Sequence, residues 1–200
     1  MLIGPMIKSP VPAASCGKVI SITLTQAEIN EILKVHNDGR ALVASGCEKR
    51  GNPGPQPAGV IPPLKWDSEL AQVAQRWAIQ CKFGHDRCRD VLSIKQNIAE
   101  RFQVGQNVAF QTNSRGHEEK LAELVKTWYD EVMGFNSSKV ENYPFDLSAG
   151  HYTQLVWGDT TIVGCGAIRY MGRNKWYSTY LVCNYGPTGN WIGQPVYQTS

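Results

Sequence analysis

The sequence predicts an α+β domain in which helices and a sheet pack in layers. Two observations lead to this fold class. The earlier part of the chain contains three stretches whose apolar residues recur at helical spacing, and the last third contains two segments rich in β-branched and aromatic residues around a turn. Helices that mostly precede strands are typical of the α+β class. The length of 200 residues is enough for one sizeable core.

The first helix is expected over residues 25–44. Thr25 and Glu28 have the spacing of a capping box at its start. Apolar residues then recur at helical spacing, with His36 on or beside their stripe and Arg40 one turn further along the same side. We therefore expect His36 to be packed and hydrogen-bonded in the core.

Two more helices follow a loop rich in glycine and proline, residues 46–63, that cannot continue a helix. Asp67 is placed to cap the second helix, whose apolar face extends to Cys81. A third amphipathic stretch is expected at about residues 118–133, with Glu131 beside its apolar stripe. Such stripes are usually core-facing surfaces rather than cofactor sites.

The C-terminal third predicts an antiparallel hairpin. Residues 161–171 and 176–186 have strand composition, and the turn sequence Gly-Arg-Asn-Lys separates them. Cys165 and Cys183 fall one in each strand and could bridge them. The sequence Gly-Pro-Thr-Gly-Asn then ends the sheet.

Composition and charge argue against several classes of protein. The formal net charge is only +3 and no basic stripe interleaves with aromatic residues, so nucleic-acid binding is not expected. No apolar run approaches the roughly 20 residues of a transmembrane segment. The six cysteines form no paired C-x-x-C knuckles, which argues against a structural zinc site and favours disulfides in an oxidising compartment, with buried free thiols as the alternative.

The N-terminus is expected to be an irregular lead-in, residues 1–20, before a domain that comprises residues 21–200. The apolar start of the chain is short and interrupted by Pro5, so it makes a poor signal peptide, and a truncated or mis-started secreted precursor is one interpretation. A sequon at Asn136 fits a secreted protein.

Two phrases carry a resemblance to a known family. On its own, His151 in "GHYTQLVW" would be a hydrogen-bonded structural residue more often than a ligand. However, "GHYTQLVWGDT" and "YLVCNYGPTGNW" closely match the signature motifs of the CAP superfamily of cysteine-rich secretory, antigen 5 and pathogenesis-related proteins. Shorter phrases such as "HNDGR", "RGNPGPQP" and "WAIQCKFGHDRCRD" resemble insect venom or salivary antigen 5. The resemblance runs from about Cys16 to the C-terminus.

The resemblance implies a three-layer α-β-α sandwich with a central, mainly antiparallel sheet. It also implies a cleft with two histidines and two acidic residues. Carried over by motif, the histidines are His85 in "FGHDRC" and His151 in "GHYTQ", and one acidic residue is Glu131 in "WYDEV". The fourth position, often glutamate in the family, is Gln106 in "VGQNVA".

These cleft residues allow two interpretations. Two neutral imidazoles, His85 and His151, can hold Zn²⁺ weakly, with water or an anion completing the coordination, and their affinity must fall as imidazoles protonate near pH 6. The alternative is that the four side chains satisfy one another as a buried polar network. Neither interpretation requires a cofactor.

The chemistry needed for catalysis is missing from the sequence. The amide of Gln106 cannot serve as a general base, and no Gly-x-Ser-x-Gly nucleophile elbow is present. We therefore expect no enzymatic activity, with a metal-dependent hydrolase that uses the His/Glu cleft as the alternative.

The resemblance also implies which cysteines pair. In antigen 5, Cys88 would have an N-terminal partner that this chain lacks, and Cys47 is an additional cysteine, so a Cys47–Cys88 bridge is a hypothesis. The segment 92–102 lengthens the connection before "VGQNVA" and could form a lid beside the cleft. The two bridges that the resemblance implies are Cys16–Cys81 and Cys165–Cys183.

The function expected from these observations is that of a secreted, extracellular, monomeric binding or effector protein. The candidate partners that the resemblance implies are a small lipid or sterol ligand, or a host protein target. The sequence places neither of them on named residues.

Overall fold

The structure of the protein is a computed structural model that describes residues 11–90, 92–95, 98–116, 120–144 and 146–200, with only the backbone for 92–95 and 98–101. The helical elements are η1 (Ala14–Cys16), α1 (Gln26–Ala44), α2 (Ser68–Ala78), α3 (Leu121–Asp130), η2 (Glu131–Gly134), η3 (Ser137–Lys139) and α4 (Gly150–Val156). The strands are β1 (Lys18–Ser21), β2 (Gly59–Val60), β3 (Lys65–Trp66), β4 (Leu92–Lys95), β5 (Ile98–Arg101), β6 (Gly105–Asn113), β7 (Ile162–Met171), β8 (Tyr177–Gly186) and β9 (Gln198–Thr199).

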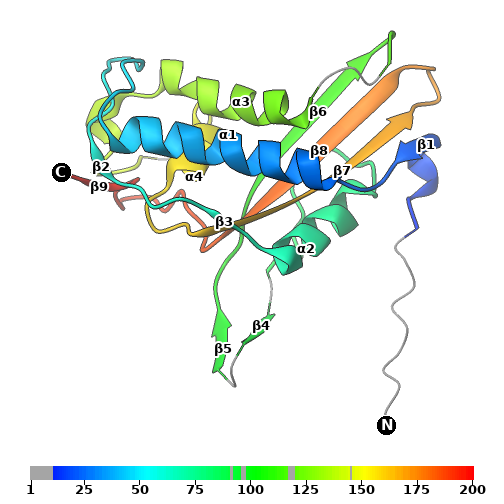
Figure 1. The fold of residues 1–200 in the computed structure, drawn as a ribbon, viewed down its shortest axis with the longest axis horizontal. Coiled ribbons are helices and arrows are strands. Elements are labelled where there is room, and N and C mark those ends of the chain that lie inside the picture. Colours follow the sequence, from blue (N-terminus) through cyan, green and yellow to red (C-terminus); the bar gives the residue numbers. More distant parts are fainter. Residues whose placement is uncertain (1–10, 91, 96–97, 117–119, 145) are drawn as a thin grey trace.

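The main sheet lies between two layers of helices (Figure 1). Its strands follow the order β1-β7-β8-β6, all antiparallel, and β3 adds a short parallel pairing to β7. Helices α1, α3 and α4 pack on one face with the larger apolar core, and α2 packs on the other. The predicted fold class, an α-β-α sandwich around a mainly antiparallel sheet, is confirmed.

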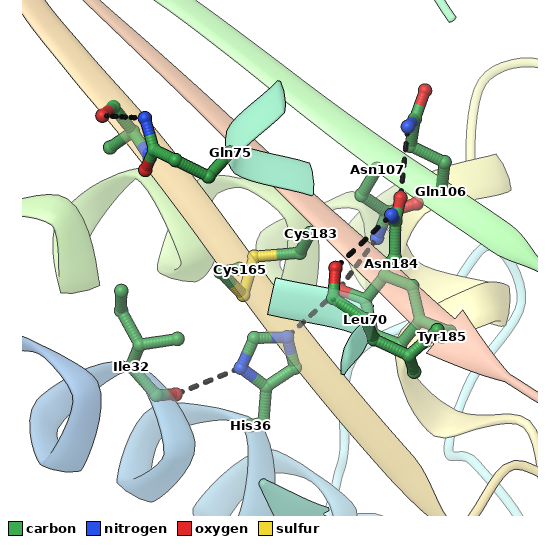
Figure 2. The surroundings of a disulfide bond; sticks show 11 residues. Ile32, His36, Leu70, Gln75, Gln106, Asn107, Cys165, Cys183, Asn184 and Tyr185 are labelled. Atoms are coloured by element: carbon green, nitrogen blue, oxygen red, sulfur yellow. Dashed lines mark hydrogen bonds between the residues drawn. A yellow bond between two sulfur atoms is a disulfide. The ribbon is translucent and has the colours of Figure 1, made fainter. Parts of the chain in front are cut away.

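Helix α1 begins where the sequence predicts. Thr25 Oγ1 accepts a hydrogen bond from the Glu28 amide, and the Thr25 amide donates to the Glu28 carboxylate, which completes the capping box. His36 is fully buried, with Nδ1 2.8 Å from the carbonyl oxygen of Ile32 and Nε2 2.8 Å from the hydroxyl of Tyr185 (Figure 2). The core role expected for His36 is confirmed.

The burial of His36 predicts a dependence of stability on pH. Burial lowers the pKa of His36 from 6.5 to about 4, and the charge of Arg40 lowers it further, against a raising effect of the hydrogen bond to Ile32. Between about pH 6.5 and pH 4, His36 therefore binds a proton in the unfolded chain but not in the folded chain. The free energy of unfolding should be highest above about pH 6.5 and should fall as the pH drops towards about 4. We expect about 3 kcal/mol of pH-dependent loss, measured by urea unfolding across this range.

The matched variant for this measurement is His36→Gln, which cannot take up the proton. It should be less stable than wild type at neutral pH but should lose less stability on acidification. Carboxylates contribute to acid unfolding in both proteins, so the difference between the two pH profiles isolates His36. Parallel profiles would contradict the prediction.

Helix α2 lies directly against β7. It starts at the predicted cap, where the Asp67 carboxylate accepts a hydrogen bond from the Leu70 amide. Strand β7 presents Gly164 and Gly166 to the helix, and a Cβ added at Gly166 would lie only 2.3 Å from Cα of Gln75. The two glycines thus permit backbone-to-backbone packing between helix and sheet.

The third predicted helix is shorter than expected. It is α3, whose apolar stripe is buried as predicted, but the chain tightens into the 3₁₀ turn η2 at Glu131 instead of continuing to residue 133. Residues 117–119 lie outside the described part of the chain, so the expected start is not addressed. The change of helix type places Glu131 at a junction, beside α4. The buried residues of the stripe are Leu121, Leu124, Val125, Trp128 and Val132.

The predicted hairpin is confirmed by the continuous pairing of β7 with β8. Cys165 lies opposite Cys183 in this register, and the two form a disulfide (Figure 2). A second disulfide joins Cys16 of η1 to Cys81, just after α2. These are the two pairs that the resemblance implies. Within the segment expected to be an irregular lead-in, residues 1–20, the structure has η1 and the first three residues of β1.

The hypothetical bridge between Cys47 and Cys88 is wrong for this fold. Both thiols are free and exposed. Cys47 follows the end of α1, whereas Cys88 lies in the loop after α2, and these helices cover opposite faces of the sheet. The structure therefore contains no bridge between these two cysteines.

The segment expected to form a lid contains the two-stranded hairpin of β4 and β5. In Figure 1 this hairpin projects away from the helical layers. Its side chains lie outside the described residues, so a covering role stays a prediction. Among the helices that the structure describes, none combines the length and apolar character needed to cross a membrane.

Candidate functional site

The residues that the resemblance assigns to a cleft lie together. His85, Gln106 and His151 line one cavity of about 460 Å³. His85 comes from the loop after α2, Gln106 from the start of β6 and His151 from the first turn of α4. Glu131 lies behind His151 and contacts its ring. All four predicted side chains therefore belong to one constellation.

Gln106 orients the first histidine. Its Oε1 accepts a hydrogen bond from the Asp86 amide at 2.9 Å and lies 3.2 Å from Nδ1 of His85. Its Nε2 donates to Asn184 Oδ1 at 2.9 Å (Figure 2). Because an amide oxygen only accepts, Nδ1 of His85 carries the proton and Nε2 keeps its lone pair. Burial lowers the pKa of His85, and the charges of Arg89 and His151 lower it further, against the raising effect of the Gln106 hydrogen bond. The ring therefore stays neutral near pH 7.

Glu131 orients the second histidine and also caps α4. Its Oε1 lies 2.6 Å from Nδ1 of His151, and its Oε2 accepts the backbone amides of His151 at 2.9 Å and Tyr152 at 3.1 Å. The ring of Trp128 stacks on the imidazole. A carboxylate that holds Nδ1–H leaves Nε2 of His151 with a lone pair, as second-sphere carboxylates do for metal-binding histidines.

The cleft wall continues into the core through a chain of hydrogen bonds. Asn107 Nδ2 donates to the carbonyl oxygen of His151 at 3.0 Å and to the hydroxyl of Tyr185 at 3.2 Å. The same hydroxyl bonds His36 (Figure 2). These contacts connect α1, β6, β8 and α4 and hold the backbone beneath His151 in one position.

Arg40 holds the other end of α4. Its Nη1 donates to the carbonyl oxygens of Leu155 and Trp157, both at 2.9 Å, and its Nη2 donates to Thr160 O at 2.9 Å. Burial lowers the pKa of Arg40 to about 9, so the guanidinium is still charged at neutral pH. With Glu131 at the N-terminus and Arg40 at the C-terminus, both charges complement the helix dipole.

Sequence reasoning missed the two elements that carry Gln106 and His151. Helix α4 has seven residues and no side-chain cap from its own N-cap residue, so it lacks the local signals of a helix start. Strand β6 begins with four buried residues of mixed polarity, which obscures the alternation typical of a strand. The polar phrase "GQN" was the available signal, and the resemblance alone drew attention to it.

The donor set suits a weak metal site. Both Nδ1 atoms have acceptors, so the Nε2 lone pairs of His85 and His151 are the ligands that the cleft offers. Across the described part of the chain, no group of three or more His, Cys, Asp or Glu side chains is arranged to hold a metal ion. Catalytic zinc sites commonly use three protein ligands, so a two-imidazole site would be open and weak.

Comparisons with known proteins agree with this architecture. A family model described as the cysteine-rich secretory protein family, CAP, matches residues 33–185. Venom allergen 5 of Brachyponera chinensis is 49% identical over 195 residues, which cover 95% of this chain and 94% of that protein. Venom allergen 5 of Dolichovespula arenaria is 47% identical over 184 residues, which cover 91% of this chain and 86% of that protein.

Solved structures show the same arrangement of elements. The crystal structure of NaASP2 with Zn²⁺ has a TM-score of 0.69 at 27% identity and covers 89% of this chain and 88% of its own. The structure of BmVAL-1 has a TM-score of 0.72 at 28% identity and covers 88% of this chain and 84% of its own.

Proposed function

Because this chain belongs to the cysteine-rich secretory protein (CAP) family, with venom allergen 5 proteins among its relatives, we propose that it is a secreted, non-enzymatic binding protein of the antigen 5 type. Its cleft binds a divalent metal such as Zn²⁺ weakly through His85 and His151. The metal is not required for folding, because two disulfides and two apolar cores already stabilise the domain.

One observation supports binding rather than turnover. Both oxygens of Glu131 are occupied, one by the imidazole of His151 and the other by two backbone amides of α4. A carboxylate that caps a helix and orients a ligand is poorly placed to take a proton from water. The other family position is Gln106, which cannot act as a base near neutral pH. Neither of the two family positions, Glu131 and Gln106, thus offers a free carboxylate base, whereas both histidines offer metal ligands.

The metal part of the proposal rests on the two Nε2 lone pairs and on the Zn²⁺ in the solved structure of NaASP2. Bound there, a divalent ion would supply Lewis acidity and a coordination position for an oxygen ligand. His85 and His151 would hold the ion, and Gln106 and Glu131 would orient them. Glu131 is already bonded to His151, and the cleft offers only two imidazole ligands, so the expected affinity is modest.

Zinc titration of single variants tests this proposal. His151→Ala should reduce the Zn²⁺ affinity at least tenfold at about pH 7.5, measured by calorimetry, because one of two imidazole ligands is lost. Gln106→Glu should increase the affinity, because it adds a negative charge that bonds His85. The matched control is Gln111→Glu, which adds the same charge further along β6, away from the cleft lining.

Zinc binding unchanged by His151→Ala would remove the site. Metal-dependent esterase or protease turnover, lost in both His85→Ala and Glu131→Ala, would establish the hydrolase alternative instead. Glu131→Gln separates two roles in that case, because it keeps an acceptor for His151 while abolishing a carboxylate base.

The partners of the domain, residues 21–200, are proposed from the family alone. They are a small lipid or sterol ligand or a host protein target, met outside the cell by a monomer. The venom allergen relatives and the two disulfides support an extracellular, oxidising setting. Lipid extraction of natively secreted protein, with binding assays for labelled sterol and palmitate, tests the ligand. If the extract contains no lipid and neither sterol nor palmitate binds, recognition of a host protein through surface loops would be favoured.

A further inference from the structure

The cleft contains a cationic side chain that the metal site does not use. Arg89 lines the same cavity as His85 and His151. Its Nε donates to the carbonyl oxygen of Val104 at 2.5 Å, and its Nη1 donates to the carbonyl oxygen of Asp86 at 2.6 Å. These two bonds fix the guanidinium against the cleft wall. A guanidinium has five N–H donors, so most of its donors are still available to a ligand.

The carboxylates near Arg89 have other partners. Asp86 accepts the Cys88 amide and pairs with Arg76, and Asp90 accepts the Val104 amide. Within the described residues, no carboxylate forms an ion pair with Arg89. As far as the described side chains show, the guanidinium therefore lines the cavity as a positive charge without a carboxylate counter-ion.

Gln106 is central to this charge balance. A glutamate there would place a negative charge against the backbone amide of Asp86 and the ring of His85, in the wall that Arg89 shares. The neutral amide keeps the hydrogen bonds and leaves out the charge. Glutamine in place of the glutamate that the family often has at position 106 thus weakens the metal site and makes this side of the cleft more favourable for an anion.

The rest of the lining indicates which anion. Asp146 also lines the cavity, and a second negative group, Glu131, lies behind His151. Both would repel a dianion such as phosphate more strongly than a monoanion. The lining also includes the apolar residue Leu147, which is 84% exposed. A single carboxylate with a short apolar group attached matches this combination.

We propose that Arg89 forms a subsite for the carboxylate of an amphiphilic monocarboxylate ligand, beside His85. This inference rests on the proposed function of the cleft as a binding site. The planar guanidinium matches a carboxylate in a paired hydrogen-bonding geometry, and its fixed side chain loses little freedom on binding. A carboxylate held here is also an oxygen donor of the kind that two imidazoles need to complete a metal site.

The test is a ligand titration of the full chain, monitored by NMR. EDTA is present throughout, so that bound metal cannot contribute to the affinity. Hexanoate is the probe, hexan-1-ol is its uncharged analogue, and inorganic phosphate is the dianion. Hexanoate should bind most tightly of the three. Arg89→Gln should weaken hexanoate binding roughly 10- to 100-fold, the usual range for losing a charge-assisted hydrogen bond. The matched control is Arg87→Gln, which removes an exposed arginine that does not line this cavity and should change nothing.

Two further variants keep the test decisive if Arg89→Gln folds poorly. Arg89→Lys retains the charge but not the planar donors, so an intermediate affinity is expected. Gln106→Glu should weaken hexanoate binding while it strengthens Zn²⁺ binding, two effects of opposite sign that a folding defect cannot produce.

Equal hexanoate affinity in wild type and Arg89→Gln would overturn the subsite. Hexan-1-ol binding as tightly as hexanoate would show that only the apolar part is recognised, and tighter phosphate binding would overturn the monocarboxylate assignment. Normal zinc binding without any hexanoate effect would reject this inference alone. If the wild-type protein binds neither Zn²⁺ nor hexanoate, the proposed binding function of the cleft would be rejected.

Discussion

Replacement of Arg40 by methionine should lower the free energy of unfolding by about 3 kcal/mol or more. Methionine keeps most of the buried volume but donates no hydrogen bond. The carbonyl oxygens that lose their donor lie in three segments, at Pro62, at the end of α4 and at Thr160, and all are packed against a fully buried side chain. Removal of a buried charge offsets part of this loss, so the estimate lies below the sum of four separate bonds.

Urea unfolding measures this effect, with Arg173→Met as the matched control because Arg173 is exposed in the hairpin turn. The control should change the free energy of unfolding by less than about 0.5 kcal/mol. Because Arg40 holds the C-terminal end of α4, the folded Arg40→Met variant should also bind Zn²⁺ more weakly through the displaced His151. If the Arg40→Met and Arg173→Met variants have the same free energy of unfolding, Arg40 does not hold the end of α4 as described.

Substitution of Gly166 by valine should be at least as damaging, with a loss of about 3 kcal/mol or more. Even the first added carbon would lie 2.3 Å from backbone atoms of Gln75 in α2, so the helix has to move away from the sheet. That movement would also disturb Gln75, whose side chain donates to the carbonyl oxygen of Ala167 and accepts its amide, both at 3.0 Å. Two bonds and a tightly packed layer are lost together.

Thermal unfolding of Gly166→Ala and Gly166→Val provides a graded test. Alanine should destabilise, and valine should destabilise more. Gly134→Ala is the control, because an added Cβ there meets no atom within 4 Å. If Gly166→Val unfolds at the wild-type temperature, α2 cannot be packed on β7 as closely as described.

Much of the fold could be predicted because its signals are local. A capping box requires only residues 25–28, and a strand–turn–strand pattern lies within residues 161–186. Periodicity and turn chemistry act over a few neighbouring residues, so the sequence contains them directly. The burial of His36 was predictable for the same reason, because its position on the stripe of α1 decides which way it points.

The candidate site could be predicted only in part. Motif resemblance identified His85, Gln106, Glu131 and His151, but their roles depend on contacts between distant segments. Glu131 caps a helix that starts nineteen positions later, and without that contact α4 has no recognisable beginning. Arg40 supports the same helix across more than one hundred residues.

The sequence by itself therefore determined the helices with local caps, the hairpin, the layered α+β class and the family. Only the tertiary structure decided that α4 exists, that Glu131 is occupied as a cap, that Arg89 lines the cleft, and that Cys47 and Cys88 are free thiols. The physical reason is the range of the interactions. Caps and periodicity depend on neighbours along the chain, whereas hydrogen-bond partners and charge balance depend on which segments the packed layers bring together.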